Sequence, residues 1–144
     1  MKSLNILAAA SFVLTGCGTF YPSAPADKVR FSAELSSDST GQSAGKGSLS
    51  ADYSPATQIL HWRLSYGGLS GPVTWAFLDG PDGTGTIAEA VPINLADESN
   101  AHPGAATLTA QQADDLMAGR WSVVLKTEQY PGGEIKGALV RTSR

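Results

Sequence analysis

Apolar and polar side chains alternate along several short segments of this chain, a period of two that is typical of strands with one buried face. The alternation is clearest in residues 28–35 and 59–66. The positions on the apolar side are Val29, Phe31, Ala33, Leu35, Leu60, Trp62, Leu64 and Tyr66. Because an α-helix repeats about every 3.6 residues, this pattern predicts an all-β domain.

Glycine and proline interrupt the chain often, with 16 and 8 residues respectively among 144. Such a turn-rich composition is unlike that of a helical bundle. Further strands are predicted at residues 73–78, about 86–93, 121–126 and 134–141, with a loop at 79–85. Residues 41–51 are interpreted as an edge strand or a loop, and residues 53–57 as a turn. Roughly six to eight strands at this spacing indicate an antiparallel sandwich or Greek-key barrel.

One segment, residues 109–120, has the features of a short helix near 109–119. The residues expected to cap it, to face the core and to end it are Thr109, Gln112, Leu116, Met117 and Gly119. Thr109 and Gln112 have the spacing of a capping box, while Gly119 is placed as a C-terminal glycine.

The first residues of the chain resemble the signal peptide of a bacterial lipoprotein. Lys2 precedes an apolar run over residues 4–14, which is shorter than the ~20 residues that a membrane-spanning helix needs. Leu14, Thr15, Gly16 and Cys17 then match a lipobox, in which the cysteine thiol is acylated. We therefore expect residues 1–16 to be a signal peptide, 17–27 a lipidated Cys17 and tether, and 28–144 the folded domain.

A lipid on Cys17 would hold the protein to a membrane without a spanning helix, because each buried CH₂ contributes about 0.8 kcal/mol. Gly18 follows Cys17, whereas lipoproteins kept in the inner membrane generally carry Asp there. This resemblance implies the periplasmic side of the outer membrane in preference to the inner membrane or the cell surface. The formal charge of -3 gives no basic surface for nucleic acid.

Five short motifs give the domain a resemblance to the CHRD (chordin-type) family over about residues 29–141. The matching residues are Phe31, Ala33 and Leu35, then Leu60, Gly68 and Leu69, then Asp79, Gly80, Pro81 and Gly85, then Thr107, Leu108 and Thr109, and finally Pro131, Gly132, Gly133, Glu134, Ile135, Lys136 and Gly137. The last group is the most specific. The resemblance implies an antiparallel Greek-key β-sandwich similar in plan to Cu/Zn superoxide dismutase.

Many bacterial members of this family carry histidines that resemble a copper or zinc site. At the matching positions this chain has Phe77, Asp79, Lys126 and Tyr130, so no imidazole remains. A phenyl ring is no ligand and an ammonium group repels a divalent cation, so the resemblance implies a degenerate site without metal or other cofactor. If the family geometry holds, Asp79 and Lys126 form an ion pair in its place.

Few other residues suggest chemistry. His61 lies within a predicted strand and His102 in a predicted loop, with no partner at metal-ligand spacing. Asp114 and Asp115 are interpreted as a solvated helix face, and Glu134 as an acceptor that fixes a turn through backbone N–H groups. The three tryptophans are expected to pack in the core on strands; these are Trp62, Trp75 and Trp121.

These observations predict a non-catalytic binding or structural module, anchored in the cell envelope through Cys17. An envelope protein that docks on a strand edge or a glycine-rich loop is the expected kind of partner. The alternative is a metal-binding or superoxide-dismutase-like redox protein of the periplasm, with His61 and His102 in a site unlike that of the family. Fold analogy alone does not separate these functions.

Overall fold

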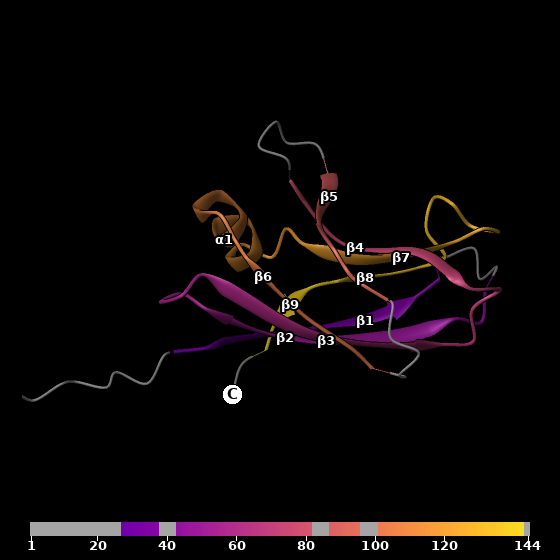
Figure 1. Cartoon of the computed structure of the whole chain (residues 1–144), viewed down its shortest axis with the longest axis horizontal. Coiled ribbons are helices and arrows are strands. Elements are labelled where there is room, and N and C mark those ends of the chain that lie inside the picture. Colours follow the sequence, from indigo (N-terminus) through magenta and orange to yellow (C-terminus); the bar gives the residue numbers. More distant parts are fainter. Residues whose placement is uncertain (1–26, 38–42, 82–86, 96–100, 143–144) are drawn as a thin grey trace, which may run out of the picture.

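The computed structural model describes residues 27–37, 43–81, 87–95 and 101–142, and this part of the chain forms strands and one short helix. The strands are β1 (Val29–Ser36), β2 (Lys46–Ser54), β3 (Ile59–Gly67), β4 (Val73–Pro81), β5 (Ile87–Pro92), β6 (His102–Thr107), β7 (Ser122–Thr127), β8 (Ile135–Ala138) and β9 (Val140–Arg141). The helix is α1 (Ala110–Met117). The predicted all-β class with one short helix is confirmed (Figure 1).

The strands form one strongly curved sheet whose two halves face each other. Their order is β5-β4-β7-β8-β1-β2-β3-β6, and β9 pairs with β1 beside β8. Every pairing is antiparallel. Figure 1 shows β4 and β7 lying across from β1, β2 and β3. The chain changes halves between β3 and β4, between β5 and β6, and between β6 and β7, as in a Greek key.

The core lies between the two halves and includes six of the eight side chains that the alternation singled out on β1 and β3; Val29 and Tyr66 are only partly buried. Its largest fully buried members are Trp121, Leu35, Leu49, Leu60, Leu64, Leu78, Leu108, Leu116, Leu125, Ile135, Leu139 and Val123. Phe31, Ala33 and Leu35 on β1 alternate with more exposed neighbours, as do Leu60, Trp62 and Leu64 on β3. Burial of one face of each strand therefore explains the period of two.

Two segments differ from the prediction, one in its place in the sheet and one in its boundary. The sequence pattern leaves residues 41–51 as an edge strand or loop, but β2 is an internal strand, hydrogen-bonded to β1 on one side and to β3 on the other. Ladder bonds on both sides hold it in place even though its glycines and serines alternate weakly. The loop predicted at 79–85 begins later, because Asp79, Gly80 and Pro81 still pair with β5. Residues 82–86 lie outside the described residues.

The sequence pattern does not predict β6, because residues 102–107 show no alternation; pairing with Ile59–Leu64 of β3 makes them a strand.

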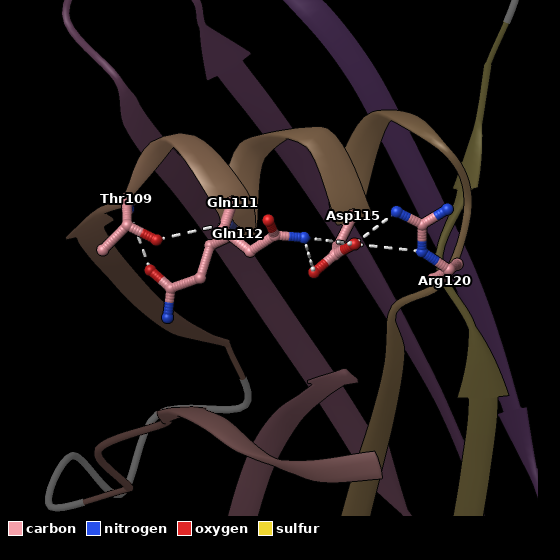
Figure 2. A network of polar contacts seen from close by, with 5 residues as sticks. All are labelled: Thr109, Gln111, Gln112, Asp115 and Arg120. Atoms are coloured by element: carbon pink, nitrogen blue, oxygen red, sulfur yellow. Dashed lines mark hydrogen bonds and ion pairs between the residues drawn. The ribbon is translucent and has the colours of Figure 1, made fainter. Parts of the chain in front are cut away.

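The capping box of α1 is confirmed: Thr109 Oγ1 accepts from the Gln112 N–H at 3.2 Å, and the Thr109 N–H donates to Gln112 Oε1 at 2.9 Å (Figure 2). Leu116 is fully buried as predicted, but Met117 is 38% exposed. Met117 lies about 100° round the helix from Leu116, away from the sheet.

Within the described residues, no helix has both the length and the apolar character needed to cross a membrane.

Candidate functional site

The degenerate metal site expected from the sequence comprises four positions, which lie on β4, on β7 and in the turn that follows β7; these are Phe77, Asp79, Lys126 and Tyr130. Ala76 and Leu78 of β4 face the core, so Phe77 and Asp79 lie on the opposite, outer face of the sheet. Lys126 of β7 lies beside them, with its Nζ 5.3 Å from the centroid of the Phe77 ring. This distance is within the range of a cation–π contact. A hydrocarbon ring and an ammonium group are therefore in contact on this face.

The expected ion pair between Asp79 and Lys126 does not form, because the strand register keeps the two side chains apart. Asp79 lies opposite Ser122, whereas Lys126 lies opposite Trp75. Four residues along a strand span about 13 Å. Lys126 lies over Phe77 instead, so the contact at this face joins a cation to an aromatic ring.

The two histidines lie on opposite faces of the sheet. His61 is exposed on β3, opposite Asp52 of β2 and Ala105 of β6. His102, expected in a loop, lies on β6, is only 5% exposed and stacks on Tyr66 with ring centroids 5.2 Å apart. Across the described ranges, no three His, Cys, Asp or Glu side chains are grouped so that they could hold a metal ion.

A buried carboxylate directly before β8 is the centre of a cluster of hydrogen bonds. Glu134 is 3% exposed and accepts four hydrogen bonds. Ser43 Oγ donates to Oε1 at 2.5 Å and the Ser70 N–H to Oε1 at 2.7 Å, while Ser70 Oγ and Thr127 Oγ1 each donate to Oε2 at 2.7 Å. We call these four residues the Glu134 cluster.

The charge state of Glu134 follows from these contacts. Burial alone would raise the pKa of the carboxyl group, but the hydrogen bonds from Ser43, Thr127 and Ser70 outweigh it and lower the pKa to about 2. Glu134 is therefore an anion at any physiological pH. Since all four donors come from the protein, the carboxylate serves to hold segments together rather than to exchange protons.

The turn before Glu134 sets its position. The Gly133 N–H donates to the Tyr130 carbonyl at 3.1 Å, and the Glu134 N–H donates to the Leu125 carbonyl at 2.8 Å. Gly133 has φ +127°, a conformation that side chains rarely adopt, which explains the glycine at this point. Glu134 is expected to fix its turn through backbone N–H groups, but the one backbone N–H that it accepts is that of Ser70, in the connection between β3 and β4, and its other three donors are hydroxyl groups. Sequence reasoning missed Ser43, Ser70 and Thr127, because isolated Ser and Thr residues give no signal.

A model of the CHRD domain family matches residues 31–139, from the middle of β1 to the residue after β8. This chain belongs to the CHRD domain family. No curated protein and no solved structure matches the chain. The Glu134 cluster, the outer face of β4 and β7, and helix α1 all lie within the matched residues.

A second buried carboxylate of the CHRD domain lies on α1 and is shown in Figure 2. Asp115 is 2% exposed and receives hydrogen bonds from both Nε and Nη2 of Arg120, and from Gln111 Nε2 at 3.3 Å. The Arg120 hydrogen bond outweighs burial and, with Gln111, lowers the pKa of Asp115. Asp114 is exposed as expected, but the expectation that Asp115 is solvated is wrong, because it ties the end of α1 to the segment before β7.

The CHRD domain also has an open groove along the beginning of β4. Its volume is about 460 Å³, and its lining residues are Val73, Thr74, Trp75, Ala76, Pro92, Ile93, Asn94 and Leu95. Trp62 and Trp121 are buried as predicted, but Trp75 is 62% exposed on the outer face of β4. The core prediction fails for Trp75 because residues 73–78 carry apolar side chains on both faces. We call this feature the Trp75 groove.

Proposed function

We propose that this CHRD domain protein is a lipid-anchored, non-catalytic binding module of a bacterial cell envelope. The observation that carries the anchoring is the lipobox of Leu14, Thr15, Gly16 and Cys17 directly after an apolar run. Acylation of Cys17 attaches the folded domain to the outer membrane on its periplasmic side, and residues 17–27 link the two. The lipid on Cys17 contacts the membrane, and the folded domain binds the partner molecule.

The geometry of the ionisable groups supports binding over catalysis. A general acid or base needs a pKa near the working pH and access to a substrate. Glu134 has a pKa of about 2 and is surrounded by protein donors, and Asp115 is buried beneath Arg120 and Gln111. Both carboxylates are engaged in holding the fold together.

The outer face of β4 and β7 supports a role without metal. The Lys126 Nζ lies over the Phe77 ring, so a positive charge stands where the family resemblance implies a cation. The redox alternative requires His61 and His102, and these lie on opposite faces of the sheet. A metal ion bound by either histidine would therefore need its own separate set of further ligands.

Fractionation tests the anchor. Cells expressing the full chain are labelled with an alkyne analogue of palmitate, and inner and outer membranes are separated. We expect the wild type to carry label in the outer membrane and Cys17→Ala to lose both label and membrane association. Gly18→Asp is the matched control: it keeps the label and moves the protein to the inner membrane. Membrane retention of unlabelled Cys17→Ala would contradict the lipid anchor.

Metal titration tests the proposal that the domain works without a metal ion. The detergent-solubilised full chain is titrated with copper and with zinc at neutral pH, after elemental analysis of the purified protein. We expect no stoichiometric binding. Tight binding of one equivalent that is lost in His61→Ala or His102→Ala would instead support the redox alternative.

A further inference from the structure

Trp75 stands apart from the other exposed apolar side chains. Large hydrophobic residues with substantial exposure in the described part of the chain are Trp75 at 62%, Val140 at 53% and Met117 at 38%. They lie on three different elements, β4, β9 and α1. Trp75 is therefore not joined to Val140 or Met117 in a broad apolar patch, which is the usual mark of a protein-docking surface. Its apolar neighbours in the groove include Val73, Pro92 and Leu95.

The indole of Trp75 is held by its neighbours. Its ring stacks on Phe77 with centroids 6.0 Å apart and an interplanar angle of 19°, and Phe77 is in turn covered by Lys126. The register between β4 and β7 shifts between Val73 and Trp75, which marks a bulge at Thr74. The Thr74 Oγ1 donates to the Lys126 carbonyl at 3.1 Å across this bulge. Trp75 thus lies on β4 beside its paired strand β7, and these contacts fix the orientation of its indole ring.

The Glu134 cluster braces the same end of β4. Ser70, which donates twice to Glu134, lies three residues before Val73, where β4 begins. Thr127, which also donates to Glu134, lies opposite Val73 in the ladder. The loop that leads into the Trp75 groove and the strand beside it are therefore tied to one buried anion. This arrangement preorganises the groove, which lowers the entropic cost of binding.

The chemistry of the groove fits a sugar ring. A pyranose has a flat face of C–H groups and a rim of hydroxyl groups, so it matches an aromatic ring flanked by polar side chains. Here the exposed indole is the flat apolar surface, and Thr74 and Asn94 are the polar residues of the lining. The Thr74 hydroxyl donates its proton to the Lys126 carbonyl, so the lone pairs of Thr74 Oγ1 can accept a hydrogen bond from a sugar hydroxyl.

The size of the groove also distinguishes a sugar from a protein. A volume of about 460 Å³ lies within the range of ligand sites, which is roughly 300–1,000 Å³. A stable protein interface buries about 800 Å² on each partner, and no other large exposed apolar side chain among the described residues shares this face with Trp75.

We infer that the Trp75 groove binds a polysaccharide chain by stacking one pyranose ring on the Trp75 indole. This inference rests on the proposed envelope location, since β-linked N-acetylhexosamine chains are a major constituent of bacterial envelopes. Equatorial linkages leave such rings flat, so that one ring contacts the indole while its neighbours extend along the open groove.

Titration of the detergent-solubilised full chain with chitotetraose, a β-1,4-linked N-acetylglucosamine tetramer, tests the inference. Because Trp62 and Trp121 are buried and Trp75 is exposed, we expect sugar binding to change the tryptophan emission through Trp75. Calorimetry in parallel gives the affinity. Trp75→Ala is expected to weaken binding about tenfold or more, and Trp75→Phe to retain part of it.

Met117→Ala is the matched control, because it removes an exposed apolar side chain from α1 and leaves the groove untouched. Equal melting temperatures of wild type and Trp75→Ala would show that a loss of binding is not a loss of fold. Absence of saturable binding by the wild type, or equal affinity in Trp75→Ala, overturns the inference. Capture of an envelope protein that depends on Trp75, without sugar binding, also overturns it.

The outcome is independent of the anchor. If chitotetraose fails while Cys17 is labelled and the protein fractionates with the outer membrane, only the sugar site is wrong. If Cys17 carries no lipid, the envelope location fails whatever the groove binds.

Discussion

Ser70 and Glu134 are 64 residues apart in the sequence, yet the Ser70 backbone N–H and its hydroxyl donate to different oxygens of the Glu134 carboxylate, each at 2.7 Å. Ser70 belongs to the connection in which the chain changes from one half of the sheet to the other. Ser43 reaches the same carboxylate from the connection between β1 and β2. Glu134 therefore joins the connection between β1 and β2, the connection between β3 and β4, and the turn before β8.

Replacing Glu134 by Gln is expected to destabilise the domain by about 2–3 kcal/mol. Hydrogen bonds to a charged acceptor contribute more than those to a neutral one, and the NH₂ group of Gln would face donors with which it cannot pair. Urea unfolding followed by circular dichroism measures the change. Glu128→Gln is the control, since Glu128 is exposed in the turn after β7. If both variants unfold at the same urea concentration, the Glu134 cluster contributes nothing to stability.

The same carboxylate predicts a loss of stability in acid. The pKa of Glu134 is lowered from 4.5 to about 2 in the folded protein. A lowered pKa contributes stability that is fully present above pH 4.5 and is lost as the pH falls towards 2. We expect the melting temperature of the wild type to fall in that window, and that of Glu134→Gln to fall less. Parallel curves for the two proteins across the window would rule out this assignment.

Helix α1 gives a local test of the capping box. Thr109→Ala removes the oxygen that accepts the Gln112 N–H and is expected to cost about 1 kcal/mol. Thr57→Ala is the comparison, because Thr57 is exposed in the turn between β2 and β3. Chemical denaturation of the two variants beside the wild type should show the loss for Thr109→Ala alone.

The fold could be predicted where the burial of one strand face dictates the sequence. Phe31, Ala33 and Leu35 follow this rule, and so does β3. The rule fails where backbone pairing decides the structure. β6 is a strand because its backbone pairs with β3, and β2 is internal because it is bonded on both sides. The second half of β2 does alternate, with Leu49, Ala51 and Tyr53 buried, but its first half and β6 give little signal.

The candidate site was harder to predict than the fold. Glu134 could be singled out from its turn motif, but its partners lie 7, 64 and 91 residues away and are ordinary Ser and Thr residues. Trp75 is expected in the core from the sequence because both faces of residues 73–78 are apolar. Only the tertiary structure shows that Ala76 and Leu78 face inward and Trp75 outward.

Gly104 provides a test of the register between β3 and β6. It lies opposite Trp62, and a Cβ at this position would clash with the indole atoms Cε2 and Cζ2. Gly104→Ala therefore forces the buried indole to move and is expected to destabilise the domain by about 1–3 kcal/mol. Gly71→Ala is the matched control, because nothing lies within 4 Å of a Cβ there.

Thermal unfolding compares these two variants, and Trp62→Leu in the Gly104→Ala background distinguishes the cause. A smaller side chain at position 62 relieves the clash with the added methyl group, so the second substitution should cost less in that background than in the wild type. Equal melting of Gly104→Ala and Gly71→Ala would mean that the indole does not lie over Gly104. The register of β6, and with it the burial of His102 on the inner face, would then need revision.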